Sequence, residues 1–371
     1  MRIRIPAFLL ACSLMLSLFR PVTSAASTPV CPMLAKKIMD NGEVLLSSSI
    51  SRLNKHKIHF CDVVKVELAS VTLSLPVCKK TMDVNLRTPY IRFDKRSGHA
   101  YLSFNHGKFA SVYGIKKNDS IRLQREKKNG YREEYKAHQY KITDRRKDYR
   151  SDAVFANFRE IRTTGMARNI LYRGCNPLGC YQFKNRPAFS AKLLKKRKIK
   201  TILNLENNTS EVLSYFRKKP YTTYYQKRYL KGTVYLGHVT VDMTSEQFGR
   251  EIIPILRFMI EHPAPYYLHC NTGKDRTGLL CAILEALMGA SYKEIIQDYM
   301  LSFENYYGVK KGSRQYQIIA DGNIKALLSK TIISSNQDKV NPAEAAARYL
   351  KQFGMTDTEI HALKIRLSTT E

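Results

Sequence analysis

The sequence predicts an α/β domain, with a central sheet flanked by helices, preceded by a small and mainly β domain. Two patterns carry this prediction. Between about Cys31 and Thr143, apolar and polar residues alternate with a period of two, which is typical of half-buried strands. After the charged stretch Asp144–Asp152, strand-like and helix-like segments alternate, which indicates helices packed on a sheet. A chain of 371 residues is also long enough for two domains.

Residues 1–26 are predicted to be a secretory signal. Positively charged residues precede the apolar run Ile5–Phe19, and small residues follow up to Ser27. A membrane anchor is the alternative, but the run is shorter than the ~20 residues that a bilayer requires. We therefore expect an exported protein, secreted or periplasmic, with a β-rich domain at 27–145 and a catalytic domain at 150–371.

The strongly basic composition narrows the range of partners. The chain has 62 Lys and Arg against 31 Asp and Glu, a formal net charge of +31. Such a surface attracts anions, whether nucleic acid, acidic lipid or phosphorylated protein. No nucleic acid is expected, because the sequence has no zinc-finger spacing, basic zipper or RNA-binding aromatic signature. Contact with an acidic membrane surface stays open, although the basic stretch Lys192–Lys200 is more typical of a solvated helix end.

The cysteine count leaves the pairing undecided. The chain has eight cysteines, and Cys12 lies in the predicted signal, so an odd number remains. Disulfides can form in an exported protein, and at least one thiol must then stay free or pair with another molecule. Two groups lie near one another in the sequence: Cys31, Cys61 and Cys78, and Cys175 with Cys180. Cys270 is expected to be a free thiol.

The β-rich region is predicted to consist of short strands, and a barrel is one way to arrange them. Val63–Val77 and Ser120–Thr143 alternate apolar and polar residues. Asn129-Gly130 predicts a hairpin turn, because both residues tolerate positive φ. No set of catalytic residues is evident here, so we expect a structural or binding role.

In the second region, two buried strands are predicted at Ile199–Leu205 and Ala264–Cys270. Between them, Thr244 and Gln247 form a predicted capping box for an amphipathic helix. Its apolar face is formed by Ile252, Ile253, Leu256 and Met259.

Further helices are predicted towards the C-terminus. One apolar helix stops at Gly289, and Ser291 with Glu294 caps the next. Asn341-Pro342 starts another helix, which ends at Gly354, and a last helix follows Thr356.

The stretch His269–Gly278, "HCNTGKDRTG", lies between a predicted buried strand and a predicted buried helix. Backbone N–H groups of a tight loop that enters a helix point at a common centre and favour an anion there. The same field favours the thiolate form of Cys270. Gly273 lets the backbone approach a ligand closely, and Arg276 can offer two parallel donors to the ligand's remaining oxygens.

A nucleophile, a cradle of amides and a bidentate cation around one anion indicate a phosphate-transfer site. We assign Cys270 as nucleophile and Arg276 as the phosphate-binding cation. The expected phosphate-binding loop comprises Asn271, Thr272, Gly273, Lys274, Asp275 and Arg276, and the expected supporting residues are His269 and Thr277.

These residues resemble the signature of the cysteine-dependent tyrosine phosphatases, which is His-Cys, five residues, Arg, then Ser or Thr. The sequence is most similar to the secreted bacterial group whose loop carries Gly-Lys-Asp-Arg-Thr-Gly. "NFRE" (Asn157–Glu160) and "LYRG" (Leu171–Gly174) match the opening motifs of that group, and Tyr349–Leu367 resembles its closing helices. The likeness has two departures: Gly174 replaces a common serine, and Asn204-Leu205-Glu206 replaces Asp-Leu-Arg.

The resemblance implies a tyrosine-phosphatase-like fold and a two-step reaction through a phosphocysteine, without a metal or other cofactor. Thr277 would donate a hydrogen bond to the departing thiolate. Asp242, in a loop upstream of Cys270 where the family places its acid, is the expected general acid, and Asp275 is the alternative. Both assignments compete with ordinary roles, namely an aspartate at a helix start and an orienting partner for Arg276.

Three functions follow, and oligomeric state is not predicted. The first is a secreted phosphatase for phosphotyrosine, with phosphoserine and phosphothreonine as further substrates. The second is a phosphoinositide or inositol phosphate phosphatase, because the extra cation Lys274 suits a substrate with more than one phosphate. The third is an inactive phosphate-binding module, against which the intact Cys270 and Arg276 argue.

Overall fold

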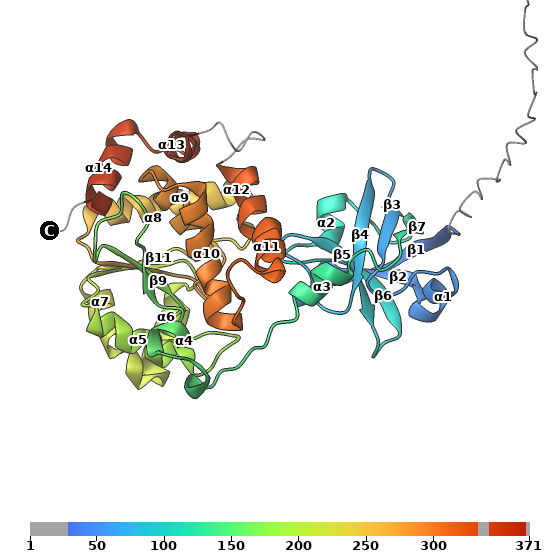
Figure 1. Ribbon diagram of the computed structural model, residues 1–371, viewed down its shortest axis with the longest axis horizontal. Helices are drawn as coiled ribbons and strands as arrows, with labels where there is room; N and C mark the ends of the chain where they lie inside the picture. Colours follow the sequence, from blue (N-terminus) through green and yellow to red (C-terminus); the bar gives the residue numbers. More distant parts are fainter. Residues whose placement is uncertain (1–28, 333–340, 369–371) are drawn as a thin grey trace, which may run out of the picture.

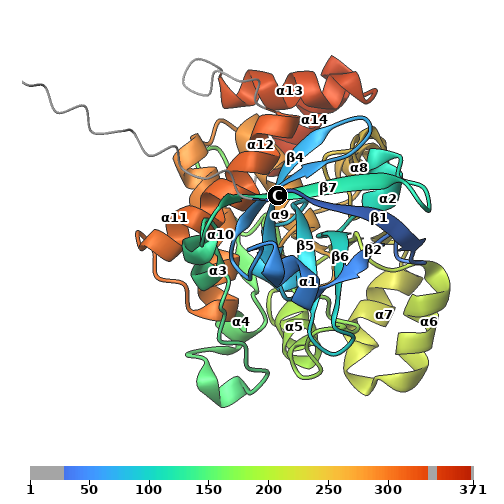
Figure 2. The same ribbon diagram turned by 90° about the vertical axis from the view of Figure 1, so that its right-hand side faces the viewer.

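The computed structural model describes residues 29–332 and 341–368, so the predicted signal at 1–26 lies outside the described residues. Figure 1 shows a β-barrel and a larger α/β domain lying next to each other, joined by an extended segment. Figure 2 looks onto the barrel, with the α/β domain behind it. The predicted fold class, an α/β domain preceded by a mainly β domain, is therefore confirmed. Within the described ranges, no helix combines the length and apolar character needed to cross a bilayer.

Seven strands close the barrel. They are β1 (Cys31–Ile38), β2 (Val44–Ser49), β3 (Val63–Glu67), β4 (Thr72–Cys78), β5 (Pro89–Asp94), β6 (His99–Phe104) and β7 (Ser120–Lys127). Their order around the barrel is β1-β2-β6-β5-β4-β3-β7, with β7 closing onto β1. The period-two pattern matches the two faces of the barrel strands. Along β1, Cys31, Met33 and Ala35 are buried in the barrel core, while the residues between them face outward. Short helical segments complete this domain: α1 (Ile50–Lys55), a 3-10 turn (Thr81–Asp83), α2 (Phe109–Tyr113) and α3 (Arg132–Ala137).

The hairpin predicted at Asn129-Gly130 is wrong. Asn129 does adopt a positive φ of 51°, but helix α3 follows the turn instead of a strand. Strand β7 already pairs with β1 along one edge and with β3 along the other. A further strand would therefore have no free edge to join.

The α/β domain is built on a five-stranded sheet. Its strands are β8 (Arg159–Glu160), β9 (Leu171–Gly174), β10 (Thr201–Asn204), β11 (Val234–Leu236) and β12 (Tyr266–His269). The order is β11-β10-β12-β9-β8, and all neighbours are parallel except β8 and β9. Strand β12 lies in the middle, so the loop that leaves its carboxyl end emerges where ligands bind in such sheets.

Helices cover both faces of this sheet. They are α4 (Asp152–Phe155), α5 (Arg186–Lys196), α6 (Thr209–Lys218), α7 (Thr223–Leu230), α8 (Glu246–Glu261), α9 (Arg276–Leu287), α10 (Tyr292–Tyr307), α11 (Arg314–Ala320), α12 (Ala326–Thr331), α13 (Pro342–Gln352) and α14 (Asp357–Ser368), with 3-10 turns at Arg146–Asp148 and Pro220–Thr222 and a π-helical turn at Asp321–Lys325. Leu268 of β12 faces the core under α8 and α9, whereas Tyr267 faces the second core under α5 to α7.

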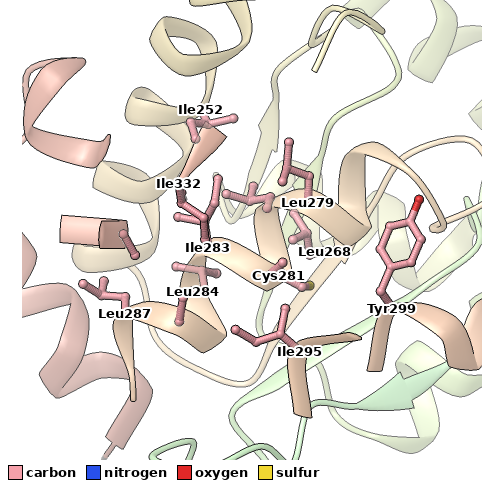
Figure 3. Packing of buried hydrophobic residues seen from close by; sticks show 14 of the residues in the cluster. Ile252, Leu268, Leu279, Cys281, Ile283, Leu284, Leu287, Ile295, Tyr299 and Ile332 are labelled. Atoms are coloured by element: carbon pink, nitrogen blue, oxygen red, sulfur yellow. The ribbon is translucent and has the colours of Figure 1, made fainter. Parts of the chain in front are cut away.

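Helix α9 is buried along its whole length after Arg276. Figure 3 shows Leu279, Ile283 and Leu284 packed between Ile252 of α8 and Ile295 of α10. A helix that is apolar on every side has to lie inside the domain. The first turn of α9, which carries Arg276, is therefore anchored by a rigid core.

The predicted helix starts are correct except for α8. Ser291 and Glu294 form the capping box of α10, and Asn341 caps α13. Helix α8 is capped by Ser245, whose hydroxyl accepts a hydrogen bond from the N–H of Phe248. The predicted cap, Thr244, instead donates its hydroxyl to the carboxylate of Asp242 at 3.1 Å.

The cysteines of the described chain are all free thiols, so neither suggested group forms a disulfide. Cys31 belongs to the barrel core, whereas Cys78 packs in a separate cluster with Val84 and Tyr90. Burial raises the pKa of Cys180 to about 11, which keeps its thiol protonated near neutral pH.

The two domains meet through helix α11 and the following π-helical turn on one side and the barrel on the other. The side chain of Gln315 donates to the carbonyl of Ala137 at 2.8 Å. Asn323 donates to the side-chain oxygen of Asn85 at 2.9 Å and accepts from the N–H of Leu86 at 3.3 Å. These bonds hold the barrel against the α/β domain.

Candidate active site

The loop Cys270–Asp275 joins the central strand β12 to helix α9. Cys270 is buried, with 3% of its surface exposed, and Asp275 occupies the N-cap position of α9. Arg276 is the first residue of the helix. Cys270 and Arg276 line one cavity of about 80 Å³. The structure thus brings together the two residues that the sequence predicts as nucleophile and phosphate-binding cation.

Glycine is required at two positions where the loop meets strand β9. Gly273 has a φ of +65°, and a Cβ there would lie 1.9 Å from the carbonyl oxygen of Gly174. At Gly174, a Cβ would lie 2.7 Å from the hydroxyl of Tyr267. Tyr267 donates that hydroxyl to the carbonyl of Cys175 at 2.7 Å. The departure at Gly174, where the resembling group commonly has serine, therefore accommodates Tyr267.

The guanidinium of Arg276 is held by residues outside the loop. Its Nη1 donates to the carbonyls of Leu205 and Val239 at 3.1 and 2.9 Å. Its Nη2 forms an ion pair with the carboxylate of Glu206, which is buried. The second departure, Glu206 in place of arginine, thus supplies the carboxylate that orients Arg276.

The opening motifs lie directly beneath the loop. The fully buried Arg173 donates to the carbonyls of Gly273 and Lys274 at 3.0 and 3.1 Å. It also pairs with Asp298 of α10 at 2.6 Å. Arg159 pairs with the same carboxylate at 2.8 Å.

This buried ion cluster stabilises the charged form of Asp298. Burial alone raises the pKa of Asp298, but the charges of Arg159 and Arg173 outweigh burial and hold the pKa below its usual value. The cluster therefore carries positive charge against the loop carbonyls, and it ties α10 and β9 to the loop.

Two further polar contacts hold the loop backbone. The side chain of Asn157 donates to the carbonyls of Thr272 and Gly273, both at 3.4 Å. The hydroxyl of Tyr306 donates to the carbonyl of Thr272 at 2.6 Å. With carbonyls held from outside, the loop backbone is fixed before a ligand binds.

His269 and Thr277, the predicted supporting residues, are both fully buried. Burial lowers the pKa of His269 to about 3, so its imidazole is neutral near neutral pH. One ring nitrogen lies 3.3 Å from the carbonyl oxygen of Cys270. The hydroxyl of Thr277 has no hydrogen-bond partner among the described residues, so it is available to a charge that develops during a reaction.

Lys274 does not line the Cys270 cavity but lines a neighbouring one of about 110 Å³, together with Tyr307. Its ammonium lies 4.5 Å from the centre of the Phe303 ring and 3.4 Å from Asp275. Burial lowers the pKa of Lys274, but the charge of Asp275 outweighs burial and raises it above the ordinary value. Lys274 therefore stays charged inside the protein.

The two candidate acids occupy different positions. Asp275 lines both the Cys270 cavity and the neighbouring one, and its carboxylate accepts a hydrogen bond from Tyr299 at 3.2 Å. Asp242 does not line the Cys270 cavity, although its neighbours Val241 and Met243 do. Its carboxylate is instead paired with Arg87 of the barrel at 2.9 Å.

Several residues around the site could not be assigned roles from the sequence. Asn157 and Arg173 lie in motifs that the resemblance singled out, but the motifs do not say what their side chains bind. Asp298, Glu206 and Arg87 carry no signal, because each is an ordinary charged residue until folding brings its partner near. Among residues 29–332 and 341–368, no cluster of three or more His, Cys, Asp or Glu side chains could hold a metal ion.

The second domain is similar to known proteins. A profile of the tyrosine phosphatase family matches residues 156–369. A tyrosine-protein phosphatase from Nostoc commune is 27% identical over 125 residues, which cover 30% of this chain and 42% of that protein. The chain thus matches less than half the length of this relative.

Two solved structures also match in part. An uncharacterized conserved protein from Thermotoga maritima is 22% identical over 26% of this chain and 36% of its own, with a TM-score of 0.25. The core catalytic domain of a PP-IP phosphatase from S. cerevisiae, in complex with citrate, is 21% identical over 46% of this chain and 95% of its own, with a TM-score of 0.26. Since the family profile spans more than half of the chain and includes the whole Cys270 loop, the chain belongs to the tyrosine phosphatase family.

Proposed function

We propose that this protein is a secreted phosphatase that hydrolyses phosphotyrosine, and also phosphoserine and phosphothreonine, through a phosphocysteine intermediate. The observation that carries the proposal is the shared cavity of Cys270 and Arg276 at the start of a buried helix. Family membership supports phosphatase activity in general. The substrate, the covalent intermediate and the export go beyond family membership and are our proposal.

In the first step, the sulfur of Cys270 attacks phosphorus, and the bond from phosphorus to the leaving oxygen breaks. The loop amides and Arg276 bind the remaining phosphoryl oxygens, whose charge changes little in a loose transition state. Glu206 and the two carbonyls that hold Arg276 keep its guanidinium oriented, so little reorganisation is needed. In the second step, water attacks the phosphocysteine and releases phosphate, and Thr277 donates a hydrogen bond to the thiolate that departs.

The leaving oxygen needs a proton, and a positioned acid contributes roughly 10²–10⁴-fold. The family resemblance favours Asp242 for this role, with Asp275 as the alternative. We propose Asp275, because it lines the Cys270 cavity whereas Asp242 is paired with Arg87. In the second step the same carboxylate would take a proton from the attacking water.

The nucleophile is tested with p-nitrophenyl phosphate. The purified protein should release p-nitrophenol, and Cys270→Ser should abolish the release. Cys281→Ser is a matched control, because Cys281 is also a buried thiol but lies inside α9, and it should keep near wild-type turnover when folded. Unchanged turnover in Cys270→Ser would remove the nucleophile from the proposal.

The acid is identified with a series of aryl phosphates. Loss of the true acid slows esters of poor leaving groups more than esters of good ones, because only poor leaving groups need the proton. We expect this difference for Asp275→Asn and a uniform effect for Asp242→Asn. The reverse pattern would assign the acid role to Asp242.

A second candidate function, hydrolysis of phosphoinositides or inositol phosphates, is favoured by Lys274. Its side chain, which is 17% exposed, lines the cavity next to that of Cys270, where a second phosphate of the same substrate could reach it. Phosphate release from phosphotyrosine peptides, phosphothreonine peptides and a phosphoinositide panel, measured side by side, decides between the two. Replacement of Lys274 by Met should reduce turnover of a multiply phosphorylated substrate more than that of p-nitrophenyl phosphate.

A further inference from the structure

The barrel forms part of the wall of the Cys270 cavity. Leu86, from the segment between β4 and β5, and His106, from the loop after β6, line the same cavity as Cys270 and Arg276. Both residues belong to the barrel domain, and at least one whole strand, β7, separates each of them from the α/β domain in the sequence. The cavity is therefore complete only when the barrel is in place.

Arg87, next to Leu86, links segments that border this cavity. Its Nη2 pairs with the carboxylate of Asp242 at 2.9 Å, and its Nη1 donates to the carbonyl of His106 at 2.8 Å. Its guanidinium also lies 4.9 Å from the centre of the Phe104 ring. The Arg87 side chain is 17% exposed and that of Asp242 33%, so this ion pair is partly shielded from solvent, unlike a fully exposed surface pair.

The partners of Arg87 belong to segments that border the cavity from different sides. Asp242 lies between Val241 and Met243, which both line it, and its carboxylate also accepts the hydroxyl of Thr244 at 3.1 Å. One guanidinium thus joins the barrel loop with His106 to the loop before α8.

We propose that Arg87 is a positioning residue of the active site, and that the barrel is a component of this site through it. Arg87 keeps the two loops at the spacing that the leaving group of the substrate requires. The inference rests on the proposed phosphatase function. Since the loop amides and Arg276 bind the phosphoryl group itself, loss of Arg87 should affect recognition of the leaving group most.

The test compares Arg87→Ala with Arg92→Ala. Arg92 is a matched control, because it lies in the same barrel, binds Glu43 with two hydrogen bonds of 2.8 and 2.7 Å, and stacks on Tyr101, but does not line the cavity. For a phosphotyrosine peptide, Arg87→Ala should lower kcat/KM roughly 10- to 100-fold, as expected for a misplaced binding surface. Arg87→Lys, which keeps the charge but not the paired donors, should give an intermediate loss. Folded Arg92→Ala should stay within about twofold of wild type.

A double-mutant cycle separates positioning from general stability. Because Arg87 acts through Asp242, the double variant of Arg87→Ala and Asp242→Asn should lose no more activity than the more severe single variant. Additive losses, wild-type kcat/KM in Arg87→Ala, or an equal loss in Arg92→Ala would each overturn the inference.

Hydrogen exchange tests the geometry without any substrate. In Arg87→Ala, backbone amides of 240–244 and 105–107 should exchange faster than in wild type, while Arg92→Ala should leave them unchanged. Unchanged exchange in Arg87→Ala would contradict the inference. The proposed function fails separately, if wild-type protein releases no phosphate or if Cys270→Ser remains active.

Discussion

Around Cys270, the two arginines Arg276 and Arg173 form ion pairs with carboxylates of the protein. Arg276 is bound by Glu206, and Arg173 is bound by Asp298 beneath the loop. Each contact fixes an orientation that phosphate binding would otherwise have to impose. A preorganised set of donors costs no reorganisation when charge shifts, which is the main source of catalytic power in sites of this kind.

His269 makes stability depend on pH. Its pKa is lowered by burial to about 3, below the value of 6.5 for an exposed histidine, so the unfolded chain takes up the proton first as pH falls. The stability that neutral His269 contributes is fully present above pH 6.5 and is lost progressively towards pH 3, at about 1.4 kcal/mol per pH unit. Urea unfolding between pH 7 and pH 5 should show this loss, and His269→Gln should show a shallower slope. Equal slopes would mean that His269 is not buried as a neutral side chain.

At the scale of elements, the loop between β12 and α9 was predictable because its signals are local. A buried apolar strand, a glycine and a helix start follow one another within a few residues, and their order alone predicts that Cys270 begins a loop that enters a helix N-terminus. The hairpin predicted at Asn129-Gly130 was wrong, because β3 and β1 occupy both edges of β7 and neither pairing is visible in the local sequence. Helix α8 is capped by Ser245 and not by the predicted Thr244, because the hydroxyl of Thr244 binds Asp242.

The same limit applies to the site. Cys270 and Arg276 are six residues apart and share one loop, so their pairing could be read from the sequence. Arg173 and Asp298 are 125 residues apart and Arg87 and Asp242 lie in different domains, so only the fold brings each pair together. A charge pattern does not identify a partner at such a separation.

Gly273 tests whether the loop conformation depends on the close approach to β9. In Gly273→Ala, the new Cβ would meet the backbone oxygen of Gly174, which cannot move without the strand. We expect the free energy of unfolding to fall by roughly 3 kcal/mol, from overpacking and left-handed strain together, and activity to be lost.

Gly312→Ala is the control for Gly273→Ala. Gly312 has a φ of +78° but no atom within 4 Å of the added Cβ, so the substitution carries the strain without the clash. It should cost about 1 kcal/mol and leave kcat/KM unchanged. If Gly273→Ala were as mild as Gly312→Ala in both stability and activity, the loop would not depend on this contact.

At the scale of the whole molecule, the barrel and the α/β domain form one functional unit. The family profile begins at residue 156, so the barrel lies outside it, yet barrel residues reach the cavity of Cys270. Bonds from Asn323 to Asn85 and from Gln315 to Ala137 also hold the two domains together. A domain that is absent from the shared part of a family can still supply the surface that selects its substrates.

The central claim, that the sulfur of Cys270 carries the phosphoryl group, is tested most directly by rapid quenching. The protein is mixed with p-nitrophenyl phosphate, stopped within the first turnover, digested and analysed by mass spectrometry. The account predicts one phosphoryl group on the peptide that contains Cys270, formed together with a burst of p-nitrophenol. A phosphoryl group on any other residue, or p-nitrophenol release with no phosphorylated peptide and no burst, would contradict it.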